Sequence, residues 1–319
     1  MKKSKENLEL ALEKVRQGDR RSLARLLTIL EDTGSLSSKL RGLVYQQSPG
    51  KAYVIGVTGA PGAGKSTLIN SVAELLSEKN SVAVIAVDPS SPFSGGAVLG
   101  DRIRMADLHT SPRVFVRSMA SRGALGGISY ATADAIALFD LAGFDYVLVE
   151  TVGTGQSEVE VGKLSDTTVL VLVPGLGDSI QALKAGILEI ADIFVINKAD
   201  KEGADAIEKD IRSMLSIAEA SKKFFWLPPI LRTVATKKEG TEELILQINC
   251  HREWLSKSRE GRAKREEIRK FRLKELLEHT VLSLLKEREG EKFTEAVNEC
   301  LLKRSNVYEA AKRILNLSE

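Results

Sequence analysis

The segment with the most chemical content is VIGVTGAPGAGKSTLIN, where glycines, a lysine and a serine follow an apolar run. From Gly59 to Ser66 it has the pattern G-x-x-x-x-G-K-S, which is typical of a loop that binds nucleotide phosphates. Its glycines let successive backbone N–H groups turn toward phosphate oxygens, and the following helix directs its positive end at the same anion. Lys65 would reach the β- and γ-phosphates, and the Ser66 hydroxyl would be a Mg²⁺ ligand. The predicted phosphate-binding loop comprises Gly59, Ala60, Pro61, Gly62, Ala63, Gly64, Lys65, Ser66 and Thr67.

A second motif indicates which base would bind. The apolar run DIFVIN ends in NKAD, where Asp200 could accept hydrogen bonds from N1–H and the exocyclic amine of guanine while Asn197 meets the other edge. Adenine lacks this donor pair and would leave a buried Asp200 unpaired. The segment RTVAT follows a further short strand, and the backbone N–H of Ala235 could contact the guanine oxygen. The predicted base-binding residues are Asn197, Lys198, Asp200, Val234, Ala235 and Thr236.

Acidic residues at the ends of apolar runs are candidate metal ligands. In ETVGTGQSE, Glu150 occupies the place where GTPases usually have the aspartate of D-x-x-G, and Gly153 could sense the γ-phosphate. A carboxylate at this place can hold Mg²⁺ through water. Asp88 and Asp101 in VDPSSPFSGGAVLGDRIRM are further candidates that would become ordered with nucleotide, and a turn or capping role is the alternative for each. The predicted metal ligands are Ser66, Asp88, Asp101 and Glu150.

The residues after Glu150 also predict the rate of hydrolysis. Thr154 stands where small GTPases have a glutamine that orients the attacking water, and Gln156 comes two residues later. We therefore expect slow hydrolysis by the protein alone and acceleration by a partner. A further glycine-containing loop, PGLGDSIQALKAGILEIAD, carries Lys184, which is either a partner-facing charge or an ordinary surface lysine.

The elements that position these residues are visible between residues 52 and 236. Short runs rich in Val and Ile (AYVIGV, VAVIAV, RVFV, DYVLVE, TTVLVLV and DIFVIN) alternate with helical stretches. Strands that are apolar throughout are buried on both faces, and their alternation with helices predicts an α/β fold with a mainly parallel sheet, a P-loop NTPase. We expect a helical extension at 1–50, a P-loop GTPase domain at 51–240 and a C-terminal helical segment at 241–319.

The two terminal segments show helical periodicity. Leu8, Leu12 and Val15 share one face, and Asp19 is the expected N-cap of the next helix. SLSSKLRGLVYQQSPGK breaks this pattern and is expected to be a linker. In the charged C-terminal segment an apolar stripe persists, so it is either a helix packed on its own domain or an arm for dimerisation or a partner. The stripe consists of Leu273, Leu277, Val281, Leu284 and Leu285.

The composition limits which classes of protein this chain can belong to. The 319 residues include 46 Lys and Arg against 43 Asp and Glu, so nothing calls for nucleic acid or a membrane surface as partner. No segment approaches the length of an apolar membrane span, and acids interrupt the basic N-terminus. Cys250 and Cys300 fit no metal or redox spacing and are expected to be reduced core thiols. These features favour a cytoplasmic protein.

Taken together, the segments GAPGAGKST, DPSSPFSGGAVLGDRIRM, ETVGTGQSE, PGLGDSIQALKAGILEIAD and NKAD resemble those of the MeaB/ArgK family of GTPases. These proteins are chaperones of adenosylcobalamin-dependent methylmalonyl-CoA mutase within the SIMIBI class of P-loop proteins. The resemblance runs over nearly the whole chain. It implies a homodimer that uses GTP and Mg²⁺, binds its mutase, gates transfer of the cobalamin cofactor, and protects or reactivates the mutase.

The resemblance also implies roles for single residues. Ser66, Asp88, Asp101 and Glu150 would serve the magnesium and switch site, and the loop with Lys184 resembles the third switch of the family. The residues expected to take part in catalysis or coupling are Lys65, Glu150, Gly153 and Lys184.

Other classes of P-loop protein fit less well. Nickel-handling relatives need clustered histidine or cysteine, and signal-recognition GTPases need a methionine-rich domain, whereas this chain has three scattered histidines and four methionines. A small-molecule kinase, a transport-associated ATPase and a binding module with GTP as a structural ligand remain as alternatives. Measurable turnover of GTP would separate a switch from the binding module, and a preference for ATP would favour the kinase.

Overall fold

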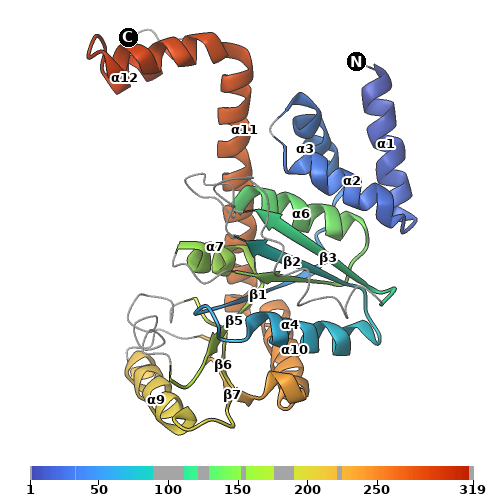
Figure 1. Cartoon of the computed structure of the whole chain (residues 1–319), viewed down its shortest axis with the longest axis vertical. Helices are drawn as coiled ribbons and strands as arrows, with labels where there is room; N and C mark the ends of the chain where they lie inside the picture. Colours follow the sequence, from blue (N-terminus) through green and yellow to red (C-terminus); the bar gives the residue numbers. More distant parts are fainter. Residues whose placement is uncertain are drawn as a thin grey trace.

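A parallel β-sheet forms the centre of the protein (Figure 1). The structure is a computed structural model that describes residues 2–32, 34–88, 111–120, 129–151, 156–175, 190–220 and 225–315. Within these ranges the sheet has seven strands, and every neighbouring pair is parallel. Across the sheet the order is β3 (Val114–Ala120), β2 (Val82–Asp88), β4 (Tyr146–Glu150), β1 (Tyr53–Gly59), β5 (Thr167–Leu172), β6 (Ile193–Asn197) and β7 (Ile230–Thr233). The α/β fold with a parallel sheet is confirmed, and each predicted apolar run forms a strand.

Helices cover both faces of the sheet, which is why its central strands are apolar throughout. One face packs against α4 (Lys65–Ser77) and α10 (Thr241–Lys257). The other face packs against α6 (Ser129–Leu141) and α7 (Gln156–Leu164), and its β6 end packs against α9 (Ala204–Ala220). Every residue of β1, β4, β5 and β6 is buried. The carboxyl ends of these strands therefore share one edge, where ligands bind in such folds.

Three helices precede the sheet: α1 (Lys2–Arg16), α2 (Arg20–Leu30) and α3 (Ser35–Gln47). Asp19 caps α2 as predicted, since its side chain accepts from the Arg21 N–H. The prediction of a linker at 35–51 is wrong over its first thirteen residues, which form α3. The pattern was obscured because the buried face of α3 includes polar side chains: Arg41 makes a buried ion pair with Asp134 of α6 at 2.5 Å.

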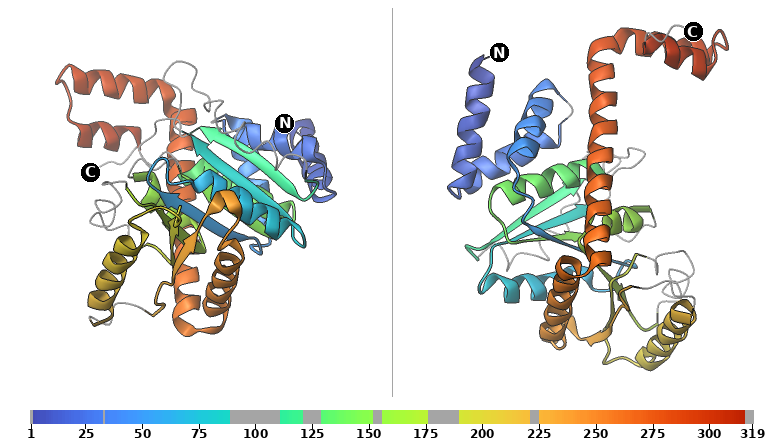
Figure 2. Two further views of the ribbon diagram at one scale, coloured as in Figure 1. Left: turned by 60° about the horizontal axis from the view of Figure 1, so that its bottom comes forward. Right: turned by 180° about the vertical axis from the view of Figure 1, so that it is seen from behind.

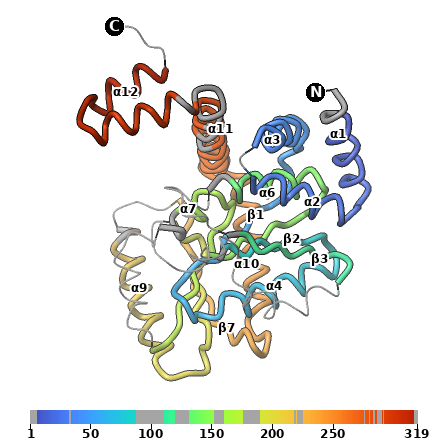
Figure 3. The backbone as a smooth tube through the Cα atoms, turned by 45° about the horizontal axis from the view of Figure 1, so that its top comes forward, coloured from blue at the N-terminus to red at the C-terminus, as the bar shows by residue number. Residues whose placement is uncertain are grey.

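The C-terminal region is helical, as predicted, and projects from the body. The 43-residue helix α11 (Arg259–Leu301) packs with its first part against α6 and α7, and its remainder carries α12 (Val307–Ile314) away from the sheet (Figure 2). Figure 3 shows α12 on the far side of α11 from α1–α3. The prediction that both cysteines are buried core thiols is wrong, because Cys250 is exposed and Cys300 is half-buried. Among the described helices, α11 included, none has the length and apolar character that a membrane crossing requires.

Candidate functional site

The predicted phosphate-binding loop connects the end of β1 to the start of α4, at the carboxyl edge of the sheet (Figure 1). Gly59 has φ +142°, and a Cβ there would lie 2.1 Å from the Val171 carbonyl oxygen of β5. Gly64 has φ +87°, and a Cβ there would lie 2.4 Å from the side-chain amide of Asn197. Glycine is required at both places, because neighbouring strands approach the loop more closely than any side chain allows.

Lys65, the first residue of α4, folds back over this loop. Its ammonium group donates to the carbonyl oxygens of Gly59 at 2.7 Å and of Ala60 at 3.0 Å, and the residue is buried. The positive charge is thereby held inside the turn whose backbone N–H groups would face phosphate. An anion bound there would meet both the ammonium group and the start of α4.

The carboxylate of Glu150 lies against the beginning of α4. Glu150 ends β4, where it is in register with Val57 of β1 and Ala86 of β2. The Ser66 hydroxyl donates to Glu150 Oε1 at 2.6 Å, and Glu150 is buried. Hydroxyl and carboxylate oxygens are the donors that Mg²⁺ prefers, so the pair fits this ion. Asp88 closes the adjacent strand β2 on the same edge, while its side chain is outside the described part.

Two threonines that sequence reasoning missed fix the chain beside Glu150. The Thr151 hydroxyl donates to the Thr58 hydroxyl at 3.1 Å, and the Thr151 N–H donates to the Val57 carbonyl at 3.3 Å. Both threonines are buried. Their signal was a polar residue at the end of each of two apolar runs, which in parallel strands meet at one edge. They hold the exit of β4 against β1.

The NKAD segment is attached directly to the phosphate-binding loop. The buried Asn197 side chain donates from Nδ2 to the Ala63 carbonyl at 2.9 Å. Its Oδ1 accepts from the Thr233 hydroxyl and from the Ala235 N–H, each at 3.1 Å. Lys198, with φ +56°, donates from Nζ to the Gly62 carbonyl at 2.9 Å. These two side chains join β6, β7 and the loop into one rigid edge.

The predicted base-binding residues thus divide into two groups. Val234 and Ala235 are buried, and the Ala235 N–H that was expected to contact guanine donates to Asn197. Asp200 and Thr236 are exposed, so the expectation of a buried Asp200 is not met by this structure. Of these two exposed side chains, only Asp200 carries a carboxylate. The contacts of these residues with a nucleotide stay a prediction.

Some predicted residues cannot be placed. Asp101, Gly153, Thr154 and Lys184 lie outside the described residues. The structure does bring together the phosphate-binding loop, Glu150 and the NKAD segment, which come from distant parts of the chain. This edge of the sheet has the parts of a site for a nucleoside triphosphate and a hard cation.

Comparison with known proteins gives the family. The chain matches, over residues 23–290, the family model described as "Methylmalonyl Co-A mutase-associated GTPase MeaB". The chain belongs to the MeaB family. It is a GTPase, as the resemblance in its motifs indicated. Binding of GTP follows from membership of the family.

Individual relatives agree with this assignment. The chain is 49% identical to a Pyrococcus abyssi protein over 276 residues, which are 86% of this chain and 84% of that protein. It is 39% identical to the GTPase ArgK of Escherichia coli over 241 residues, 73% of this chain and 72% of that one. A solved structure titled "LAO/AO transport system kinase" covers 97% of this chain and 96% of its own, with a TM-score of 0.67 at 28% identity. The two folds are therefore similar over nearly the whole length of both chains.

Proposed function

We propose that this GTPase is Mg²⁺-dependent and acts as a chaperone of an adenosylcobalamin-dependent acyl-CoA mutase of the methylmalonyl-CoA mutase type. It would gate loading of the cofactor and protect or reactivate the mutase. The observation that carries this proposal is the match of residues 23–290 to a family named for its association with that mutase. The contact of Ser66 with Glu150 supports the Mg²⁺ part, because it supplies two oxygen ligands at the phosphate-binding loop.

The residues of the loop would hold the phosphates of GTP. The backbone N–H groups of residues 59–67 would donate to phosphate oxygens, and Lys65 would exchange its two carbonyl partners for the β- and γ-phosphates. This exchange is favourable because a charge-assisted hydrogen bond to phosphate is stronger than one to a neutral carbonyl. The loop is already fixed by Asn197 and Lys198, so little backbone ordering is required on binding.

The metal would be held by Ser66 and Glu150, with Asp88 and Asp101 as further ligands. A bound Mg²⁺ neutralises charge that develops on the transferred phosphoryl group. Glu150 would orient the ion from the end of β4, which Thr151 fixes through its bond to Thr58. Gly153 would report the presence of the γ-phosphate to the following segment.

The base would be read chiefly by Asp200, whose carboxylate accepts from both N–H groups on one edge of guanine. Asn197 would contribute by holding the loop after β7, since its amide oxygen accepts from the Ala235 N–H. Thr236 and Val234 would line the base on that side. Lys184 would couple the nucleotide state to the mutase.

We propose further that the protein is a homodimer. The two copies would meet through the part of α11 that projects away from the sheet. This part exposes leucine and valine side chains along one face, among them Leu277 and Leu284. An apolar stripe on a helix that leaves its own domain is a typical protein interface. A second copy of this chain would bury it.

The test is turnover of GTP and ATP by the purified protein, alone and with a cobalamin-dependent methylmalonyl-CoA mutase. We expect slow GTP hydrolysis that rises many-fold with the mutase, and no turnover of ATP. GTP turnover that ignores every such mutase would contradict the chaperone role and leave the GTPase standing. Preference for ATP would favour the small-molecule kinase or transport-associated ATPase instead.

A further inference from the structure

A cavity of about 250 Å³ lies at the opposite edge of the sheet from the phosphate-binding loop. Its wall includes Ala52, just before β1, and Asp166, just before β5. Because all strands run parallel, these starts of strands face away from the carboxyl edge. The seven residues of β1 separate the two sites by about 20 Å, at a rise near 3.3 Å per residue. A ligand in this cavity would not occupy the nucleotide site.

Three arginines of α11 line the cavity: Arg265, Arg269 and Arg272. Their spacing of four and three residues places them on one face of the helix. Two carboxylates, Asp140 and Asp166, lie in the same wall, so three positive groups face two negative ones. The excess of cationic side chains indicates an anion as ligand.

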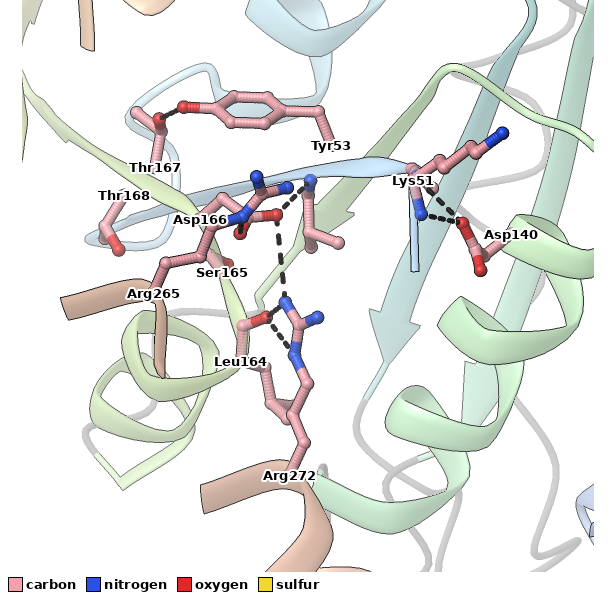
Figure 4. Close-up of polar contacts among 12 residues, drawn as sticks. Lys51, Tyr53, Asp140, Leu164, Ser165, Asp166, Thr167, Thr168, Arg265 and Arg272 are labelled. Carbon is pink, nitrogen blue, oxygen red and sulfur yellow. Dashed lines mark hydrogen bonds and ion pairs between the residues drawn. The ribbon is translucent and has the colours of Figure 1, made fainter. Parts of the chain in front are cut away.

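The carboxylate of Asp140 already has a full set of donors. It accepts from the backbone N–H groups of Gly50 at 2.6 Å, Lys51 at 2.7 Å and Ala52 at 2.6 Å, and from the Ser48 hydroxyl. Figure 4 shows it beside Lys51, away from the two arginines that are drawn. Asp140 therefore serves to fix the chain entering β1. Among the described residues, the ion pairs of the cavity arginines are made with Asp166 and not with Asp140.

Asp166 compensates only part of the charge of these arginines. It accepts from the Val54 N–H at 2.9 Å, and its oxygens lie 3.4 Å from Arg265 Nε and 4.0 Å from an Arg272 nitrogen. In Figure 4 Arg265 and Arg272 converge on it from α11. One carboxylate thus faces two guanidinium groups, which have five N–H donors each.

Most arginine donors remain available. Arg272 uses Nε and one terminal nitrogen on the Leu164 carbonyl. Burial lowers the pKa of Arg272, Asp166 and Tyr45 oppose this shift, and the charges of Arg265 and Arg269 add to it. Arg269 is exposed and makes no hydrogen bond or ion pair with any residue of the described ranges. A bound anion would satisfy these donors and relieve the repulsion.

Ser48 and Gly50, which donate to Asp140, also belong to the polar part of the wall, and the remaining side chains are apolar except for the Tyr45 hydroxyl. The side chains of Ala133, Ile136 and Ala137 come from α6, Leu273 comes from α11, and the ring of Tyr45 comes from α3. Inorganic phosphate alone would leave this surface in contact with water. A ligand with an apolar group next to its charged group would cover both parts of the wall.

We propose that this cavity, formed by Arg265, Arg269 and Arg272 of α11 against α6 and the start of β1, binds a phosphate monoester with a short apolar substituent. Phosphate suits the arginines because a guanidinium group donates two parallel hydrogen bonds to it. The ligand would bridge α11 to the sheet domain. A ligand bound in the cavity would hold the first part of α11 in place against the sheet domain.

Phenyl phosphate is the probe, titrated by calorimetry into the full-length protein saturated with GDP and Mg²⁺. We expect saturable binding that is at least about tenfold tighter than that of inorganic phosphate, because only the ester contacts the apolar wall. No saturable binding, equal affinity for inorganic phosphate, or binding that GDP abolishes would each overturn the proposal.

Matched variants locate the site. Arg269→Gln should weaken binding of phenyl phosphate by about tenfold or more, since it removes a charged donor that has no other partner among the described residues. Lys270→Gln, the neighbouring exposed cation that pairs with Glu266, should leave affinity within about twofold. GTP turnover by both variants should equal that of the unmodified protein, which shows that they fold. Equal affinity of Arg269→Gln and the unmodified protein for the ester would refute the site.

Discussion

The Ser66 hydroxyl donates to Glu150 Oε1 over 2.6 Å, which joins the first turn of α4 to the last residue of β4. In the proposed site both oxygens are ligands of Mg²⁺, directly or through water. We predict that Glu150→Gln lowers Mg²⁺-dependent GTP turnover by about tenfold or more, because the amide keeps the shape but removes the charge that attracts the ion. Phosphate release over a Mg²⁺ titration measures this, and the half-saturating concentration should rise.

The matched control is Glu243→Gln, which removes the same charge from an exposed position in the first turn of α10. Its turnover should stay within about twofold of the unmodified protein. An unchanged Mg²⁺ dependence of Glu150→Gln would mean that Glu150 serves only to hold Ser66.

Asp200 is the exposed acid that follows β6, and it is proposed to read guanine. We predict that Asp200→Asn weakens GTP binding by about a hundredfold, because one of the two carboxylate acceptors becomes an NH₂ that faces a guanine N–H group. Xanthosine triphosphate should bind the variant more tightly than the unmodified protein, since xanthine has a carbonyl where guanine has its amine. Competition of both nucleotides against a fluorescent GDP measures the two effects.

Asp205→Asn is the control. Asp205 is an exposed acid in the first turn of α9, five residues after Asp200, and it pairs with Arg232. Its preference for GTP should not change. If Asp200→Asn also kept its preference, guanine would be recognised by other residues.

The strands and the phosphate-binding loop could be predicted because their signals are local. Runs of β-branched residues, and glycines at the turn after β1, specify structure within a few positions. The helix α3 could not be predicted in this way. Its Arg41 is buried because it pairs with Asp134 of α6, which lies 93 residues away in the sequence. A local pattern counts such an arginine as exposed.

The candidate site shows the same division. The motif NKAD drew attention to a segment that lies against the phosphate-binding loop, but it did not show that Asn197 binds the carbonyl of Ala63 and the N–H of Ala235. Those partners depend on how β6 and β7 lie against the loop, which is a property of the assembled sheet. The arginines of α11 gave no signal either, because a charged helix face is usually solvated.

His251 of α10 predicts a pH dependence of stability. It is fully buried beside Trp226 and Trp254, with Nδ1 2.8 Å from the Thr167 hydroxyl. Burial lowers its pKa to about 4, Asp192 and Asp166 oppose this, and Lys264 adds to it. Below pH 6.5 the unfolded chain therefore binds a proton that the folded chain does not, so folding loses stability as the pH falls toward 4.

We expect His251→Gln to remove this loss. Between pH 7 and pH 5 the unmodified protein should lose about 2 kcal/mol more of its free energy of unfolding than the variant does. Urea unfolding at the two pH values measures the difference, and groups common to both proteins cancel. Equal losses would show that His251 is not held neutral.

The exposed stripe of α11 predicts the oligomeric state. Leu277 is 64% exposed and Leu284 is 52% exposed, and their spacing of seven places them on one face. We predict that the unmodified protein is a dimer and that Leu277→Ser with Leu284→Ser makes it a monomer, because apolar burial drives such contacts. Light scattering gives the mass, and Lys274→Ser with Glu278→Ser, which removes an exposed ion pair on the same helix, should remain dimeric. A dimer that survives loss of both leucines would place the interface elsewhere, since two polar residues at its centre would disrupt it.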